Sequence, residues 1–339
     1  MVIAGPGAGK TELLSLRIAN ILHTVDVSPH EILCLTFTDA AAVNLKSRLQ
    51  SVIGSEALKV NVLTFHSFAQ NLIYSHREFF GERSDYEMCD EVQTLQILTD
   101  VIQELPPNHP LKVTQEGKFL YINDLKQQIA DLKRSGFTPS AWKLELDQLS
   151  VDLDLLSRYV LPFFEALPRL SKKLIPEFDK LLADLEQLNE TGFIKKFKFD
   201  LFQALQVAKE TQKTKTLSEF KKQYLRRDDH GSLVLIDKYN LEKYQGIAWI
   251  YARFTDLMGQ LKLFDYTDML LWVLDNMKSN IGFLRTLQEN YQFIMVDEYQ
   301  DTSGVQLAIL KLWAQTPFDE APNLFVVGDD DQAIYKFSG

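Results

Sequence analysis

The sequence predicts an α/β fold in which a parallel sheet is interrupted by a large, mostly α-helical insertion. Three observations support this prediction. A short apolar stretch at the start passes through a glycine-rich run into a segment with helical apolar spacing. A four-residue apolar run at 293–296 is followed directly by two carboxylates. The long stretch between them has the apolar periodicity of helices rather than strands.

The first expected element is a short strand that ends at Ile3 and leads through a loop into a helix. The loop reads Ala4-Gly5-Pro6-Gly7-Ala8-Gly9-Lys10-Thr11. Strand, glycine-rich loop and helix in this order form a Walker A arrangement, in which backbone N–H groups and a helix N-terminus surround phosphate oxygens. We therefore expect residues 4–11 to bind ATP, with Lys10 on the β- and γ-phosphates and Thr11 on Mg²⁺. The alternative is a glycine-rich turn that opens an ordinary helix.

The next two strands are expected at 32–37 and 60–64. The first ends in Thr36-Phe37 and the second is followed by Phe65, so each brings a hydroxyl and an aromatic ring to its carboxyl end. Ligands of open α/β sheets bind at that edge. These residues are therefore candidates for contact with a ligand.

The middle of the chain is expected to be a helical domain inserted into the nucleotide-binding domain. We expect residues 1–85 to form the first part of that domain, residues 86–250 the insert, and residues 251–339 the second part. The stretches 92–105 and 122–133 have amphipathic helical spacing.

The strand at 293–296 is apolar throughout, as expected for a strand buried on both faces. Asp297 and Glu298 follow at its carboxyl end, where ligands of such sheets bind. We expect Asp297 to hold Mg²⁺, and Glu298 to act as the base that deprotonates the attacking water. The alternative is a pair of solvated carboxylates after a strand.

A last strand is expected at 324–327, and polar residues and then aromatic ones follow it. Gln332 can sense a γ-phosphate by hydrogen bonding. Tyr335 and Phe337 can offer flat faces on which nucleobases stack. The alternative for the two rings is packing in the core.

Composition sets outer bounds on the function. The 339 residues suffice for two domains, and no apolar run approaches the ~20 residues that span a bilayer. Cys34 and Cys89 form no disulfide or metal framework, so we expect reduced thiols in a cytoplasmic protein. The net charge is −10, but residues 190–229 carry ten Lys or Arg against six Asp or Glu, a difference of +4. This basic stretch either lies on phosphates or is a solvated helical face.

Taken together, the motifs resemble the N-terminal portion of the UvrD/Rep-like superfamily 1 DNA helicases. The resemblance follows the order and spacing of six stretches, at 4–11, 35–42, 64–68, 264–270, 296–302 and 327–337. It implies a RecA-like P-loop NTPase core, with ATP and Mg²⁺ as cofactors and single-stranded or duplex-junction DNA as partner. It further implies an ATP-dependent translocase that moves 3′ to 5′; the motifs identify no protein partner.

The resemblance also implies roles for single residues. Lys10, Thr11, Asp297, Glu298 and Gln332 serve ATP and Mg²⁺ in this comparison. The residues implied to lie along the path of single-stranded DNA are Phe37, Thr38, Thr64, Phe65, His66 and Phe337. The stretch 264–270 is expected to serve packing.

Some positions depart from the family pattern. Asp39 and Ala40 stand where relatives often carry Asn and Lys, and Ser338 stands where Arg is common. Because the family continues into a second RecA-like domain, we expect this chain to be part of a longer helicase and weakly active by itself. Two alternatives remain, namely the helicase subunit of a helicase–nuclease complex and a nucleotide-gated DNA-binding module with little turnover.

Overall fold

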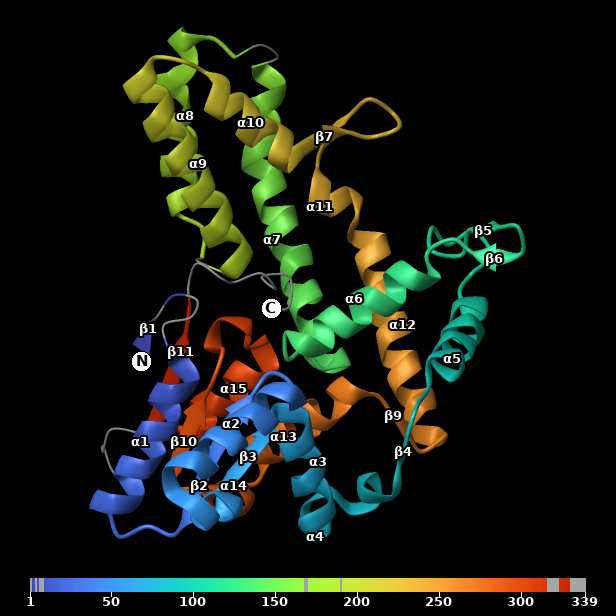
Figure 1. Cartoon of the computed structure of the whole chain (residues 1–339). Helices are drawn as coiled ribbons and strands as arrows, with labels where there is room; N and C mark the ends of the chain where they lie inside the picture. Colours follow the sequence, from blue (N-terminus) through green and yellow to red (C-terminus); the bar gives the residue numbers. More distant parts are fainter. Residues whose placement is uncertain are drawn as a thin grey trace. The chain divides into compact units, whose positions relative to one another are not determined.

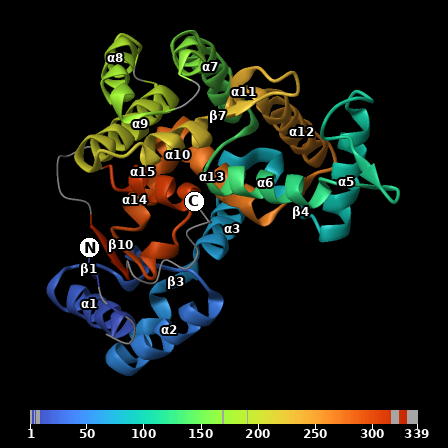
Figure 2. The same ribbon diagram turned by 90° about the horizontal axis from the view of Figure 1, so that it is seen from above.

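The chain folds as two compact units, each with its own hydrophobic core (Figures 1 and 2). The computed structural model describes residues 2–3, 5, 9–167, 170–189, 191–315 and 323–329. The first unit comprises residues 1–105, 114–138 and 253–339, and the second comprises residues 106–113 and 139–252.

A five-stranded parallel sheet forms the centre of the first unit. In spatial order its strands are β1 (Val2–Ile3), β11 (Leu324–Gly328), β10 (Phe293–Val296), β2 (Ile32–Thr36) and β3 (Asn61–Thr64). All four neighbouring pairs are parallel. The carboxyl ends of the five strands therefore meet at one edge of the sheet.

Helices cover both faces of this sheet. Cys34 of β2 belongs to the core beneath α1 (Lys10–Thr24) and α2 (Asp39–Ile53), and its neighbour Leu35 belongs to the core on the other face. The helices on that second face are α3 (Phe65–Ser75), α13 (Tyr266–Ser279), α14 (Ile281–Asn290) and α15 (Gly304–Trp313). Burial on both faces requires strands that are apolar throughout, which accounts for the run at 293–296.

Three more helices and two small strand pairs complete the first unit. The helices are α4 (Arg77–Phe80), α5 (Glu91–Glu104) and α6 (Ile122–Arg134). The strands are β4 (Glu87–Met88) with β9 (Leu263–Phe264), and β5 (Thr114–Gln115) with β6 (Lys118–Phe119). Because β4 and β9 pair in parallel, two segments that are far apart in the sequence lie side by side within this unit.

The second unit is mainly helical. Its helices are α7 (Pro139–Ala166), α8 (Ile175–Glu186), α9 (Gly192–Thr211), α10 (Lys215–Tyr224), α11 (Ile236–Tyr239) and the first part of α12 (Leu241–Gln260). An antiparallel pair, β7 (Leu225–Arg227) with β8 (Leu233–Leu235), joins α10 to α11. Its core contains mainly Leu and Phe side chains from α7, α8, α9 and α10.

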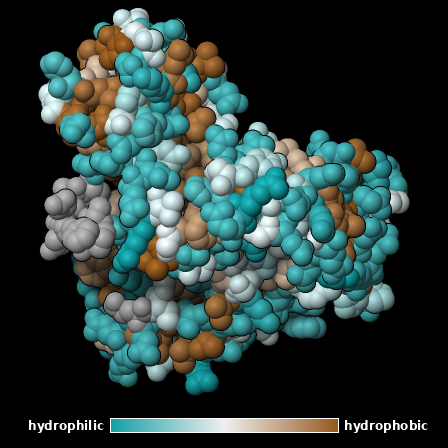
Figure 3. Space-filling view, turned by 90° about the horizontal axis from the view of Figure 1, so that it is seen from below, coloured by the Kyte–Doolittle hydropathy of each residue, from teal (hydrophilic) through white to brown (hydrophobic). Residues whose placement is uncertain are grey.

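The predicted fold class is confirmed: a central parallel sheet carries helices on both faces, and a mostly helical stretch interrupts it. The predicted insert at 86–250 overlaps the second unit without coinciding with it, because 86–105 and 114–138 cluster with the sheet. Among the described residues, no helix is both long and apolar enough to cross a membrane. On the face that Figure 3 draws, hydrophobic residues lie in groups among hydrophilic ones.

Candidate nucleotide-binding site

The residue groups singled out in the sequence follow the strands at the carboxyl edge of the sheet. They are the phosphate loop after β1, Asp297 and Glu298 after β10, Phe37 and Thr38 after β2, and Thr64, Phe65 and His66 at the end of β3. Parallel pairing sets Ile3 beside Gly328, and Val296 beside both Val326 and Leu35. The topology thus gathers segments from both ends of the chain.

Gly9 forms the turn from the phosphate loop into α1. Its φ of 81° and ψ of 25° lie in the left-handed region, which glycine adopts without the strain that a side chain would bring. Lys10 begins the helix and is 8% exposed, and Thr11 follows it in the first turn. Gly5 is exposed. The other predicted loop residues, Ala4, Pro6, Gly7 and Ala8, lie outside the described residues.

Lys10 lies between two carboxylates at this edge. Its Nζ is 3.2 Å from Glu298 Oε2 and 3.9 Å from Asp329 Oδ2. Nevertheless, Nζ is buried and makes no hydrogen bond with a described residue, because these approaches lack hydrogen-bond geometry. A buried ammonium with unused donors fits phosphate oxygens, as expected for the lysine of a phosphate loop.

Asp297 is held almost entirely out of water, with 5% of its surface exposed. Burial, and then the charge of Glu298, raise the pKa of its carboxyl above the ordinary value, although Lys10 acts in the opposite direction. Its Oδ1 accepts a hydrogen bond of 3.0 Å from the Glu298 backbone N–H. A buried carboxylate whose charge is incompletely compensated fits a divalent cation, with the Thr11 hydroxyl as the second predicted ligand.

Two residues that the sequence analysis did not select complete this cluster. Gln300 donates from Nε2 to Glu298 Oε2 at 2.7 Å, and it accepts from the Asp329 backbone N–H at 2.9 Å. Asp329 is 3% exposed. Asp329 follows a buried strand as Asp297 does, and this signal could have identified it. Gln300 lies within the stretch 296–302, but nothing local in the sequence predicts its two contacts.

The hydroxyls predicted on the DNA path cap helices. Thr38 accepts from the Ala41 N–H at 3.1 Å and caps α2, whereas Thr64 accepts from the Ser67 N–H at 3.2 Å and caps α3. Phe37 is exposed (42%), but Phe65 is 4% exposed within the core. We therefore no longer propose the Phe65 ring as a DNA contact.

His66 lies against an aromatic ring that the sequence analysis had assigned to packing. Its ring centroid is 4.9 Å from that of Tyr266, and Tyr266 is 55% exposed. Burial lowers the pKa of His66, although Asp265 and Asp39 act in the opposite direction. The pair therefore offers uncharged rings at neutral pH. Within 264–270 it is Tyr266 that faces solvent, while Phe264 and Met269 are buried.

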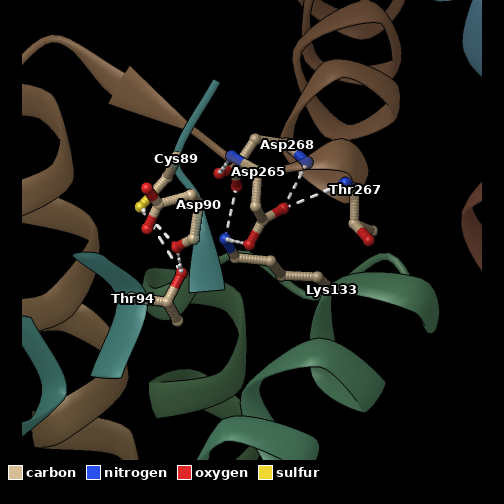
Figure 4. Close-up of polar contacts among 7 residues, drawn as sticks. All are labelled: Cys89, Asp90, Thr94, Lys133, Asp265, Thr267 and Asp268. Atoms are coloured by element: carbon tan, nitrogen blue, oxygen red, sulfur yellow. Dashed lines mark hydrogen bonds and ion pairs between the residues drawn. The ribbon is translucent and has the colours of Figure 1, made fainter. Parts of the chain in front are cut away.

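Tyr266 directly follows Asp265, which belongs to a buried ion cluster with Lys133 and Asp268 (Figure 4). Lys133 of α6 is fully buried, and its Nζ lies 2.6 Å from both Asp265 Oδ2 and Asp268 Oδ1. Asp265 caps α13 by accepting from the N–H groups of Thr267 and Asp268. Although burial opposes it, the pKa of Lys133 is raised by Asp268 and Asp265. A pocket of about 200 Å³ opens beside the cluster, with Tyr266 and Asp265 in its lining.

Three predicted site residues, Gln332, Tyr335 and Phe337, lie outside the described residues. The basic stretch 190–229 lies on α9, α10 and β7 of the second unit. Part of its charge is paired: Lys209 Nζ lies 2.6 Å from Asp179 Oδ1, and the Arg226 guanidinium lies 3.8 Å from the centroid of the Tyr239 ring. A solvated helical face and a phosphate-binding surface both remain compatible with this arrangement.

Comparison with known proteins agrees with this geometry. The family model described as the UvrD/REP helicase N-terminal domain matches residues 1–339. The chain is 24% identical over 339 residues to ATP-dependent DNA helicase PcrA of Staphylococcus epidermidis (strain RP62A), and equally so to that of Staphylococcus aureus (strain Mu50). Each match covers 100% of this chain and 32% of the relative, so the chain spans about a third of their length. With Lys10 and the acidic end of β10 close together at one edge of the sheet, the chain belongs to the UvrD/REP helicase family and matches its N-terminal domain.

Proposed function

We propose that this chain is the ATP-binding portion of a DNA helicase that uses ATP hydrolysis to move along single-stranded DNA. The observation that carries the proposal is the approach of Lys10 to Glu298 at the sheet edge. A buried lysine at the start of a helix, close to the carboxylate that follows another strand of the same sheet, is an arrangement suited to phosphoryl transfer to water.

In the proposed reaction, the oxygen of a water molecule attacks the γ-phosphorus while Glu298 takes its proton. The bond between the γ-phosphorus and the bridging oxygen breaks, and ADP leaves with that electron pair. Inorganic phosphate is the second product, and Glu298 releases the proton to solvent. Lys10 offsets negative charge on the phosphates, and Gln332 is proposed to contact the γ-phosphate.

The residues present fit a magnesium ion. Thr11 and Asp297 would hold it, and the bound ion would neutralise charge on the β- and γ-phosphate oxygens. In its absence, the buried Asp297 carboxyl faces the charge of Glu298. Thr11 and Asp297 therefore act by binding, and the proton transfer belongs to Glu298.

The DNA path is proposed along the ends of β2 and β3. Phe37 and Tyr266 offer exposed rings there, with His66 half-buried against Tyr266, and base stacking on such rings tolerates any sequence. Tyr335 and Phe337, and the capping residues Thr38 and Thr64, are proposed as neighbours of this path. Movement from 3′ to 5′, and action at duplex junctions, are proposed from membership of the family.

Hydrolysis is tested by single-turnover reactions with protein in excess over radiolabelled ATP, with and without single-stranded DNA. Glu298→Gln is expected to lower the rate by about 10²–10⁴-fold and to leave the affinity for an ATP analogue unchanged. Lys10→Ala is expected to weaken analogue binding. The exposed Glu289→Gln variant is the matched control. If Glu298→Gln hydrolyses ATP as fast as the wild type, Glu298 is not the base. If the wild type itself shows no measurable hydrolysis, a nucleotide-gated binding module becomes the better description.

The DNA path is tested with a fluorescent oligonucleotide at several salt concentrations. Replacing Tyr266 with Ala is expected to cost roughly 1–3 kcal/mol of binding free energy, the usual contribution of one stacked base. The salt dependence should not change, because the ring carries no charge. An unaltered affinity would remove the end of β3 from the proposed path. Tyr74→Ala, an exposed ring (46%) on α3, is the control.

A further inference from the structure

The side chain of Gln300 connects two segments of the proposed active site. Gln300 lies in the short 3₁₀ turn Tyr299–Asp301, directly after the acidic pair. Its amide nitrogen donates to Glu298 Oε2 at 2.7 Å. Its amide oxygen accepts from the backbone N–H of Asp329, the first residue after β11, at 2.9 Å.

The two contacts fix the orientation of the amide. Rotating it by 180° would set Oε1 against a carboxylate oxygen and set the NH₂ group against an N–H, so both hydrogen bonds would be lost together. The side chain therefore holds the Glu298 carboxylate and the end of β11 at the same time. Both ends of Gln300 are used, and one of its bonds is to a charged group, which makes that bond the stronger kind.

The arrangement distinguishes the two oxygens of Glu298. Oε2 accepts from Gln300 and lies 3.2 Å from Lys10 Nζ, whereas no described residue makes a hydrogen bond to Oε1. Glu298 itself has φ 50° and ψ 48°, a left-handed conformation that is strained for a residue with a side chain. Because Gln300 and Lys10 both lie at Oε2, Oε1 is the oxygen left to meet a water molecule.

The end of β11 approaches Gln300 so closely that a side chain does not fit there. A Cβ built on Gly328 would lie 2.9 Å from Gln300 Oε1 and 3.3 Å from the Gln300 backbone nitrogen. The φ of Gly328 is not positive, so alanine would be acceptable to the backbone and the contact alone would resist it. Gly328 thus permits the hydrogen bond between Asp329 and Gln300.

We infer that Gln300 is a positioning residue for hydrolysis: it orients the Glu298 carboxylate, with Oε1 toward the attacking water, and it takes its own position from the end of β11. The inference rests on the proposed role of Glu298 as the base. The inferred role of Gln300 affects the rate of the chemical step and not the affinity for nucleotide, because its amide makes hydrogen bonds to Glu298 and Asp329 and to no described residue of the phosphate loop.

The test compares variants in the single-turnover reaction, where the maximal rate and the half-saturating protein concentration are obtained separately. Gln300→Met keeps the length of the side chain and removes both hydrogen bonds. Its maximal rate is expected to fall about 10–100-fold, the usual effect of a displaced catalytic group, while the half-saturating concentration stays within about twofold. Gly328→Ala should give the same pattern, because the added methyl group displaces the amide without altering its chemistry.

The chain provides a matched control. Gln292 Nε2 donates to Glu31 Oε1 at 2.9 Å, which is the same amide–carboxylate pair at a position before β10 rather than after it. Gln292→Met is expected to keep the wild-type rate and affinity. Thermal denaturation of all three variants identifies any that fail to fold, and the rates are compared among folded variants.

The outcomes separate this inference from the proposed function. If Gln300→Met and Gly328→Ala both keep the wild-type maximal rate, or if they lose rate and affinity in parallel, Gln300 has a merely structural role and the inference is wrong. If instead Glu298→Gln hydrolyses ATP as fast as the wild type, Glu298 is not the catalytic base, and it is the proposed function that is wrong. A selective loss of rate in both Gln300→Met and Gly328→Ala, with Gln292→Met unaffected, supports the inference.

Discussion

At the scale of single residues, the burial of Asp297 costs the folded protein stability when no ligand is bound. The pKa of this carboxyl is raised above the ordinary value of 3.8, so the folded state holds the proton more firmly than the unfolded chain does. The free energy of unfolding therefore decreases as pH rises from 3.8 through the raised pKa of Asp297, because the carboxyl loses its proton over this range. Above that value the full cost of the buried charge remains.

Asp297→Asn is accordingly expected to stabilise the nucleotide-free protein at pH 7, by roughly 2 °C in the midpoint of thermal unfolding. The advantage should shrink as pH falls toward the ordinary Asp value, since the wild-type carboxyl then becomes neutral as well. Thermal denaturation of both proteins over a pH series measures this difference. Asp26→Asn, at an exposed position, should show no such trend. If Asp297→Asn is less stable than the wild type at pH 7, the ionised Asp297 carboxylate stabilises the folded protein and the prediction is wrong.

The sequence identified some residues of the candidate site and missed others. The difference depends on how far apart in the chain the interacting residues are. Lys10 and Glu298 belong to patterns a few residues long, in which a strand, a loop and a charged group follow one another. Gln300 accepts a hydrogen bond from the backbone N–H of Asp329, 29 positions away. The parallel pairing of β10 with β11 brings the two residues together. No local pattern reports such a contact. In contrast, Phe65 fits the motif but its ring is buried by α3 packing against the sheet.

At the scale of elements, the attachment of α6 to the N-terminus of α13 depends on Lys133. Removing this cation would leave the buried Asp268 and the half-buried Asp265 without compensation, and breaking a buried ion pair typically costs about 3–5 kcal/mol. Lys133→Met is expected to lower the free energy of unfolding by about this amount. Urea denaturation measures the change.

Two further variants make this prediction specific. Lys126, on the same helix, pairs with Glu91 in an exposed position, so Lys126→Met should cost less than about 1 kcal/mol. Adding Asp268→Asn to Lys133→Met should recover part of the loss, because one uncompensated carboxylate is removed. Equal losses for Lys126→Met and Lys133→Met would mean that the buried cluster contributes no more than a surface pair.

The elements themselves were largely readable from the sequence, but their partners were not. Apolar runs predicted β2 and β10, and helical spacing predicted α5 and α6. The sequence placed α6 in the insert because it follows the motif at 64–68 and precedes the one at 264–270. Its tertiary partners lie at α13: Lys133 contacts Asp265, which is 132 residues further along the chain. Apolar periodicity carries no information about contacts between such distant residues.

At the scale of the whole molecule, the two units have separate cores, so we expect two unfolding transitions in calorimetry. A ligand that binds one unit stabilises that unit by mass action, by about 2.7 kcal/mol when its concentration is 100 times Kd. A non-hydrolysable ATP analogue with Mg²⁺ should therefore raise one transition and leave the other in place. In Lys10→Ala neither should move. A single transition that moves as a whole would mean that the units unfold together.

Pairing of the first strand with the last also determines when the site can form during synthesis. Ile3 of β1 lies beside Gly328 of β11, with the whole second unit encoded between them. At about 5–20 residues per second, a ribosome needs roughly 15–65 s to pass from one partner to the other. Residues 139–252 can fold during that interval, while the phosphate loop has no neighbouring strand. We therefore expect the proposed nucleotide site to form only in chains whose translation has passed β11, and a nascent chain stopped earlier to carry the loop without the site.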